Sequence, residues 1–394
     1  MRSNLLVVRQ PLAMRRLLRQ EERPPHSDIA NGRLLRPSVS QRHESEYMKH
    51  LGNVLYVTTP EAFLTLDGEN VVIKKEDEQG KSASTRLPLH NLENIVCFTW
   101  LGASPALMGA CAERNVGLTF LTPNGRFQGR VTGRVRGNVL LRKKQFEWSE
   151  EEARSVPIAQ SFLLGKISNC RKVLERAIRD HAMLVDVDSL TGASNFMKET
   201  LKAIPQCRST GDLMGFEGSA AKIYFGVFDH LILHQRDDFF FRERNRRPPL
   251  DNMNALLSFL YTLLTNETAS ALETVGLDPY IGFLHRDRPG RPSLALDLME
   301  ELRPVLADRL ALSLVNRKQI NGKGFTQKES GGVLMDDDTR KAVLVAWQER
   351  KKEEIIHPYL KEKIPFGLLP HVQAMLLARY LRGDLDAYPP FFWS

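Results

Sequence analysis

Residues 215–225 read GFEGSAAKIYF, which is the pattern of a helix with one buried face. Ala221, Tyr224 and Phe228 follow Glu217 at the spacing of helical turns, so this stripe should face a core. A carboxylate at the head of such a stripe loses hydration, and it needs a cation, a hydrogen-bond donor or a proton. The stretch predicts a helix and marks Glu217 as a candidate functional residue. If the metal-free protein offers Glu217 no partner, Glu217→Ala should raise the stability.

Similar helical patterns fill the chain from about residue 155 onward. They cover residues 158–181, 215–235, 253–272, 293–315, 336–355 and 368–384. The region before them carries short β-rich runs separated by Asp-Gly, Asn-Gly and Pro turns, ending with NVLLRKKQFEW at residues 138–148. One helical insertion begins at Ser104, which can cap it. The sequence predicts an α+β fold, with a β-rich domain at residues 48–150 and a larger all-helical domain at 151–394.

Residues 1–47 differ from the rest, with nine arginines, no lysine, five acidic residues and little periodicity. A transit peptide or an amphipathic anchor is a weaker interpretation than a basic extension. We expect this segment to be disordered and dispensable, because it lacks an apolar pattern that could offset the entropy of ordering.

The net charge of +8 and the pI of about 9.3 favour polyanionic partners such as nucleic acid. The four cysteines form no CxxC pair, which argues against a zinc knuckle and against a disulfide framework, and favours a reducing compartment. No apolar run is long enough to span a bilayer, so we expect a cytoplasmic protein with no membrane partner. In the loop at 234–251, arginines beside three phenylalanines suit contact with nucleic-acid backbone and bases. A solvated loop with a buried Phe anchor explains the same composition.

An acidic cluster lies within HRDRPGRPSLALDLMEEL, residues 285–302. Ser293 can cap a helix here, and one side of that helix carries Asp297, Glu300 and Glu301. An exposed helix tolerates such clustering. However, His285 lies in a Gly/Pro-rich loop that can fold back onto the helix start. Carboxylates with one imidazole suit Mg²⁺ or Mn²⁺ better than zinc.

Several enzyme classes lack their motifs here: there is no GxxxxGK[ST], no Rossmann GxGxxG and no GxSxG. His230 and His234 stand four residues apart without a glutamate between them, and we assign them to packing rather than to zinc. The run at 336–338 is typical of a helix N-terminus. A metal–carboxylate site in a basic protein can transfer phosphodiesters without a Ser or Cys nucleophile.

Four stretches resemble a known family, the CRISPR-associated integrase that captures new spacers, in the form found with type I subtype C systems. They are GRFQGRVTGRVRGNVLLRKKQF at 125–146, GFEGSAAKIYFGVF at 215–228, RRPPLDNMNALLSFLYTLL at 246–264 and GLDPYIGFLHRDRPGRPSLALDLMEELRP at 276–304. They occur in the family's order and spacing, and residues 1–47 lie outside the resemblance.

The resemblance implies the residues of a metal site. A glutamate, the histidine of the downstream loop and an acid on the next helix bind the ion, which here means Glu217, His285 and Glu300, with Mg²⁺ or Mn²⁺ as the metal. Asp297 corresponds to an acid that assists the site. Because Glu301 is adjacent, the choice among the three acids stays open.

The resemblance also implies an activity and partners. Each 3′-hydroxyl of a prespacer DNA would attack a repeat boundary of a CRISPR array in a transesterification. The chain would form a homodimer through the β-rich domain and bind a small ferredoxin-like CRISPR partner protein. Charge and position suggest phosphate contacts at Arg242, Arg244, Arg246, Arg247, Arg286, Arg288 and Arg291. The alternatives are a general metal-dependent DNA nuclease of repair or transposition, and a non-catalytic DNA-binding scaffold.

Overall fold

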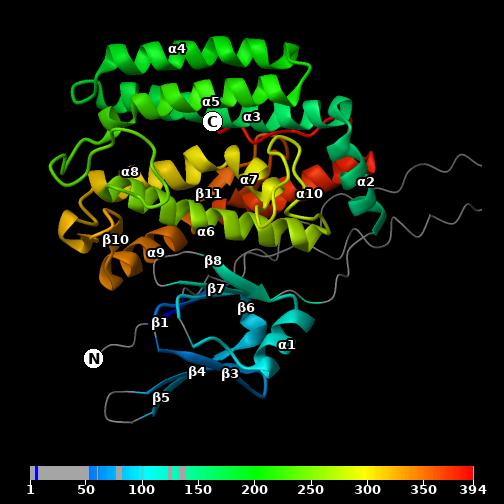
Figure 1. Ribbon diagram of the computed structural model, residues 1–394, viewed down its shortest axis with the longest axis vertical. Helices are drawn as coiled ribbons and strands as arrows, with labels where there is room; N and C mark the ends of the chain where they lie inside the picture. The colour runs from blue at the N-terminus through cyan, green and yellow to red at the C-terminus, as the bar shows by residue number, and fades with distance from the viewer. Residues whose placement is uncertain are drawn as a thin grey trace, which may run out of the picture.

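The computed structural model describes residues 5–7, 53–59, 61–76, 82–99, 101–122, 127–131, 133 and 139–393. It shows a strand-rich domain below a helical domain in the view of Figure 1. The predicted α+β fold class is confirmed.

The strand-rich domain contains two sheets. The larger has the strand order β1-β2-β6-β7-β8, with β2, β6 and β7 parallel and both edge strands antiparallel. Its strands are β1 Leu5–Val7, β2 Asn53–Val57, β6 Leu92–Cys97, β7 Gly117–Leu121 and β8 Phe127–Val131. The smaller sheet is antiparallel and consists of β3 Phe63–Asp67, β4 Asn70–Glu76 and β5 Ser82–Pro88. Helix α1, Pro105–Glu113, is capped by Ser104 as predicted, because its side chain accepts a hydrogen bond from Leu107 N.

The two faces of the larger sheet serve two cores, as alternation along a strand requires. On β2, Leu55 and Val57 join the core of the strand-rich domain, whereas Val54 and Tyr56 join the core of the helical domain. The contact between the domains is also polar, since the Gln348 amide lies 2.8 Å from the Tyr56 hydroxyl. The β-rich domain is therefore packed firmly against the helices.

The helical domain contains nine α-helices within the described residues. They are α2 Val139–Glu150, α3 Glu152–His181, α4 Val187–Ala203, α5 Thr210–Gly226, α6 Asn252–Val275, α7 Ser293–Glu300, α8 Arg309–Asn316, α9 Asp337–Lys352 and α10 Leu369–Arg382. The domain is not all-helical as predicted, because two short hairpins interrupt it. They are β9 Phe325–Gln327 with β10 Val333–Met335, and β11 Glu354–Ile356 with β12 Lys363–Pro365.

Three local predictions were wrong. The run at 138–148 is helix α2 rather than a strand, because Leu141 and Gln145, four residues apart, are its buried residues. The predicted helix at 293–315 is broken into α7, a π-helical turn at Pro304–Asp308 and α8, and Pro304 lacks the N–H that an uninterrupted helix needs. The helix predicted at 215–235 ends at Gly226, and a short 3₁₀ turn at Phe228–Leu231 follows.

The N-terminal segment departs from the expectation of disorder at one place. Leu5–Val7 form β1 and pair antiparallel with β2. The other residues of 1–47 lie outside the described residues.

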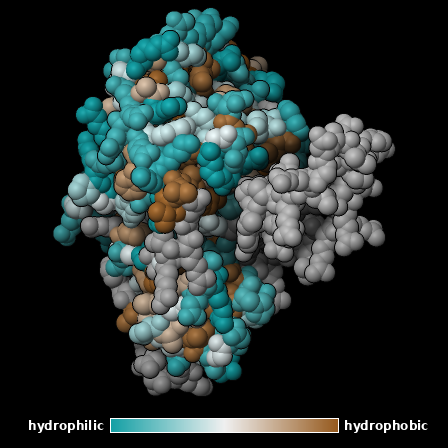
Figure 2. All heavy atoms as spheres, turned by 90° about the vertical axis from the view of Figure 1, so that its right-hand side faces the viewer, coloured by the Kyte–Doolittle hydropathy of each residue, from teal (hydrophilic) through white to brown (hydrophobic). Residues whose placement is uncertain are grey.

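No helix in the described part of the chain is long and apolar enough to cross a membrane. Figure 2 shows a mainly hydrophilic surface over the helical domain, with apolar atoms gathered in smaller patches.

Candidate functional site

Glu217 is held by an ammonium group. Its Oε1 contacts Nζ of Lys166 on α3, and the same Nζ lies 2.8 Å from Oε2 of Glu300 on α7. Lys166 is 5% exposed and Glu300 is 3% exposed, whereas the Glu217 side chain is 26% exposed. The predicted stability gain of Glu217→Ala is therefore no longer expected, because Glu217 has a partner.

Glu300 binds a second cation, since Arg303 NH2 lies 2.9 Å from its Oε1. Burial raises the pKa of Glu300, but the charges of Arg303 and Lys166 outweigh burial and lower this pKa to about 2. Burial likewise lowers the pKa of Lys166, and the two carboxylates outweigh it and raise that pKa above its ordinary value. Both groups are thus charged at neutral pH.

Asp297 orients His285. Its Oδ1 lies 2.6 Å from Nδ1 of His285 and accepts a hydrogen bond from the His285 backbone N–H at 3.0 Å. Its Oδ2 accepts from the N–H groups of Phe283 and Leu284 at 2.7 and 2.9 Å. These contacts occupy the carboxylate, so Asp297 holds the loop and leaves Nε2 as the ring nitrogen that can bind an ion.

Two glycines allow these close approaches. A Cβ at Gly282 would lie 2.8 Å from the His285 carbonyl oxygen and 2.9 Å from Asp297 Oδ2. A Cβ at Gly165 would lie 2.8 Å from the Cβ of Glu301, so Gly165 lets α7 pack closely on α3.

Glu301 contacts the C-terminal segment instead of Lys166. It binds the Tyr388 hydroxyl, the Phe391 N–H at 2.6 Å and the Gln373 amide at 3.1 Å. Burial raises the pKa of Glu301 to about 7. Among the three acids of α7, Glu300 is therefore the one that faces Glu217.

Helix α7 is buried on every side, which excludes an exposed acidic helix: Asp297, Glu300 and Glu301 are each at most 3% exposed. The predicted cap at Ser293 was wrong, because Pro292 is the N-cap residue. Ser293 is the first helical residue, and its hydroxyl donates to the Arg286 carbonyl at 3.2 Å.

The structure brings the predicted metal ligands together only in part. No group of three His, Cys, Asp or Glu side chains in the described ranges is arranged to hold a metal ion. Glu217 and Glu300 nevertheless meet at one cation, the Lys166 ammonium. Two carboxylates and an imidazole fit Mg²⁺ or Mn²⁺ by donor type, provided that the Lys166 ammonium moves away from the carboxylates.

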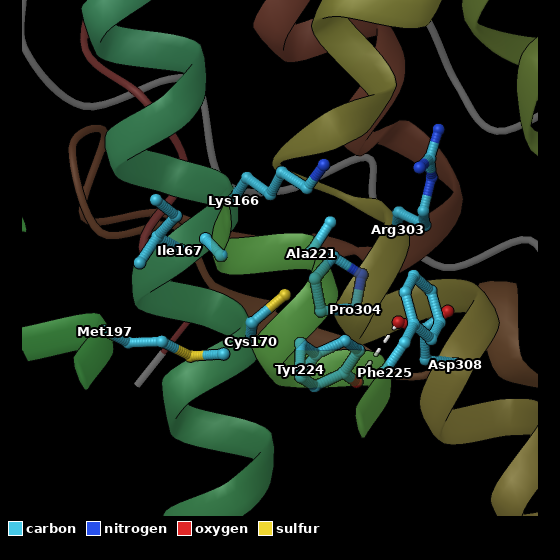
Figure 3. A pocket seen from close by; sticks show the side chains of 11 residues that line it. Lys166, Ile167, Cys170, Met197, Ala221, Tyr224, Phe225, Arg303, Pro304 and Asp308 are labelled. Carbon is cyan, nitrogen blue, oxygen red and sulfur yellow. Dashed lines mark hydrogen bonds between the residues drawn. The ribbon is translucent and has the colours of Figure 1, made fainter. Parts of the chain in front are cut away.

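A small cavity of about 10 Å³ lies next to this ion pair, with room for about one water. Figure 3 shows Lys166 and Arg303 beside it, with Asp308 and Tyr224 at its other end. Asp308 accepts hydrogen bonds from the hydroxyls of Tyr224 at 3.2 Å and Tyr261 at 2.6 Å, and burial raises its pKa to about 6. The cavity is too small for a nucleotide.

A large groove of about 1690 Å³ offers a place for a polymer. It lies between β8 and α6, and its lining includes Arg130, Arg246, Arg247, Arg288, Arg291 and Arg340. Four of these were predicted as phosphate contacts. Arg130, which pairs with Glu273 at 3.1 Å, and Arg340, which is 2% exposed, were not among the predicted phosphate contacts.

The other predicted arginines lie outside the groove lining. Arg244 donates to Asn254 Oδ1 at 2.7 Å and to Ser258 Oγ at 3.0 Å, and it stacks on Tyr261, so it holds the loop in place. Arg242 is exposed and stacks on Phe240, and Arg286 is exposed.

The remaining sequence features have structural explanations. Phe239 and Phe241 are buried, which favours the anchored-loop interpretation of 234–251. His234 is exposed, so assigning it to packing was wrong, whereas His230 is half-buried and lies 4.0 Å from Asp186. The helix that would have aligned the two ends earlier. Asp336 caps α9 as predicted, accepting from Thr339 N at 2.7 Å. All four cysteines are buried free thiols.

The family profile described as CRISPR associated protein Cas1 matches residues 55–349. The chain belongs to the Cas1 family. It is 53% identical over 351 residues to a CRISPR-associated endonuclease Cas1 of Rhodospirillum rubrum, covering 88% of this chain and 100% of that protein. A CRISPR-associated endonuclease Cas1 of Chlorobaculum tepidum is 49% identical, with coverage of 88% and 99%.

Solved structures share the Cas1 fold. A casposase bound to integration product superposes with a TM-score of 0.75 at 20% identity, covering 86% of this chain and 94% of that one. A Cas1 protein from Thermotoga maritima superposes with a TM-score of 0.71 at 24% identity, covering 85% and 98%. A Cas6-RT-Cas1–Cas2 complex gives a TM-score of 0.71 at 23% identity, covering 88% and 36%. The predicted family and the predicted endonuclease class are confirmed.

Proposed function

We propose that this Cas1 chain is a metal-dependent DNA integrase that inserts prespacer DNA into a CRISPR array. The observation that carries the proposal is the meeting of Glu217 and Glu300, from separate helices, at one buried cation. A site that holds two carboxylates against one positive charge has the donors and the charge to bind Mg²⁺ or Mn²⁺. His285, fixed through Nδ1 by Asp297, would supply the nitrogen ligand.

The chemistry is a transesterification at phosphorus. The prespacer 3′-hydroxyl loses its proton as its oxygen bonds to a phosphorus at the repeat boundary, the bond from that phosphorus to the array 3′-oxygen breaks, and the released 3′-oxygen takes up a proton, so bonds and protons balance. A bound divalent ion supplies activation of the attacking oxygen and stabilisation of the developing charge.

The residues of the chain hold this site and its substrate. Asp297 fixes the ring orientation of His285, and Arg303 keeps Glu300 ionised. Arg246, Arg247 and the other groove arginines would bind backbone phosphates and position the DNA.

We also propose the partners that the resemblance implies. These are prespacer and repeat DNA, a second copy of the chain bound through the β-rich domain, and a small ferredoxin-like CRISPR partner protein. A Cas1–Cas2 complex among the structures of the same fold supports the last. The subtype C assignment and a cytoplasmic location belong to the same proposal.

Strand joining tests the proposal. Purified protein with the small partner protein, Mn²⁺ or Mg²⁺, and a prespacer with free 3′-hydroxyls should join that DNA to a plasmid that carries a CRISPR repeat. Cutting of branched DNA without joining would favour the general nuclease. DNA binding that does not depend on metal, with neither joining nor cutting, would favour the non-catalytic scaffold.

A further inference from the structure

Lys166 lies between the two carboxylates that we propose as metal ligands. Its Nζ contacts Glu217 Oε1 and lies 2.8 Å from Glu300 Oε2. We infer that Lys166 is an internal counter-cation, which joins Glu217 and Glu300 in the metal-free protein and competes with the divalent ion for them. The competition rests on the proposed function, whereas the role in the metal-free protein does not.

Charge balance makes such a cation necessary. Glu300 is 3% exposed, and a second carboxylate at the same place would repel it strongly in this environment. Arg303 neutralises Glu300 from its other oxygen, Oε1, at 2.9 Å. Among the ion pairs of the described residues, only that of Lys166 includes Glu217, so Lys166 is the residue whose ion pairs join α5 to α7.

The side chain of Lys166 can also move away from the two carboxylates. A lysine carries its point charge on a flexible four-carbon stem, unlike the rigid fork of an arginine. The Glu217 side of the ion pair is open, with 26% of that side chain exposed. The cavity beside Lys166 holds about one water, so the ammonium would move toward the open side rather than inward (Figure 3).

Removal of the Lys166 ammonium should have opposite effects on stability and on metal affinity. Without the ammonium, Glu217 loses its ion-pair partner beside a buried Glu300 that keeps only Arg303, so the metal-free protein should be less stable. Without its competitor, the divalent ion should bind more tightly, because Glu217 and Glu300 no longer have to leave the ammonium of Lys166 before they can bind the ion. If Lys166 served only for packing, its replacement would lower the stability of the protein without tightening the binding of the metal ion.

The test uses the full-length protein and Mn²⁺ alone as the probe. Lys166→Met should lower the melting temperature in EDTA by about 5 °C or more. It should also tighten Mn²⁺ binding, followed by electron paramagnetic resonance, by about tenfold or more. Lys166→Arg keeps the charge and should stay closer to the wild type in both measurements.

Lys351 supplies a matched control. It is 4% exposed and pairs with Glu267 at 2.7 Å, away from Glu217 and Glu300. Lys351→Met should lower the melting temperature in EDTA and leave the Mn²⁺ affinity unchanged. Adding Glu217→Gln to Lys166→Met restores the charge balance, so this double variant should melt higher in EDTA than Lys166→Met alone.

The outcomes separate the inference from the proposed function. If the wild type and Lys166→Met bind Mn²⁺ equally, and Glu300→Gln abolishes that binding, the metal assignment stands and the inference is wrong. If neither protein binds Mn²⁺, the metal assignment fails together with the competition. If Lys166→Met cannot be purified, the charge-balanced double variant must be recovered folded, and its loss would also overturn the inference.

Discussion

At the scale of single residues, the chemistry depends on how Asp297 holds His285. Asp297 accepts three backbone hydrogen bonds and one from the imidazole, all from residues 283–285. Asp297→Asn removes the charge and one acceptor oxygen from a fully buried position. We expect a loss of about 1–3 kcal/mol in the free energy of unfolding and a fall of about 10- to 100-fold in Mn²⁺ affinity. Calorimetric titration and urea denaturation measure the two effects.

Asp336→Asn provides the control for this variant, because Asp336 caps α9 and contacts none of the proposed ligands. It should leave Mn²⁺ binding unchanged. Unaltered Mn²⁺ affinity in folded Asp297→Asn would show that Asp297 does not position the site.

Asp308 should make stability depend on pH. Its ordinary pKa is 3.8, and burial raises the pKa to about 6 in the folded protein. Between these values the folded protein keeps a proton that the unfolded chain has released, so the free energy of unfolding falls as the pH rises through this window. Asp308→Asn lacks this titration. Between pH 4 and pH 7 the free energy of unfolding of the variant should rise by roughly 2–3 kcal/mol relative to that of the wild type. If the two proteins differ in this free energy by the same amount at both pH values, the prediction is wrong.

The sequence indicated part of the site at this scale. Glu217 stood out as an acid at the head of an apolar stripe, and His285 and Glu300 followed from motifs. Lys166 was missed, although a signal existed. It occupies a helical face with Phe162 and Cys170, both buried, so a lysine there must have a buried partner. The partner itself comes from distant helices, which local spacing cannot reveal.

At the scale of elements, the start of α6 organises the loop that lines the groove. Asp251 caps the helix by accepting from Asn254 N at 2.7 Å, and it also accepts from Asn245 Nδ2 at 3.3 Å. Asp251→Ala should lower the free energy of unfolding by about 1–2 kcal/mol and speed amide exchange at Asn245 and Leu250, at the two ends of this loop. Asp336→Ala removes the equivalent cap of α9 and should leave exchange at these two amides unaltered. Equal amide exchange in the two variants would show that the Asp251 cap does not hold the loop in place.

The elements that the sequence misassigned share a physical cause. Helix α2 has buried residues only at Leu141 and Gln145, and its other positions gave no helical stripe to recognise. It lies inside the predicted β-rich range 48–150, yet it packs on α3 and α10. Helix α4, Val187–Ala203, was not predicted at all, although Asp186 caps it. Tertiary packing, rather than local pattern, decides such segments.

Across the whole molecule, the groove lined by β8 and α6 is the surface where arginines gather, with six of them in its lining. Reversing Arg246 and Arg247 to Glu should weaken DNA binding and flatten its salt dependence, by about 2 units of the log–log slope if each arginine contacts one phosphate. Lys198 and Lys202 are exposed residues of α4, the helix that lies at the end of the helical domain away from the strand-rich domain in Figure 1, so their reversal is the control. Binding isotherms over a salt series measure both. An unchanged slope in the Arg246 and Arg247 variant would exclude the groove as the phosphate-binding surface.

We propose that Glu217 holds the metal ion at the reacting phosphate. The decisive measurement is the rate at which folded Glu217→Ala joins a 3′-hydroxyl prespacer to a repeat-bearing plasmid with Mn²⁺, alongside a melting curve and a DNA-binding isotherm. We expect a loss of joining of at least about 10²-fold, near-native DNA affinity and a cooperative melt, with His285→Ala and Glu300→Ala behaving alike. A cooperatively melting Glu217→Ala protein that joins DNA at the wild-type rate would show that Glu217 does not hold the metal ion.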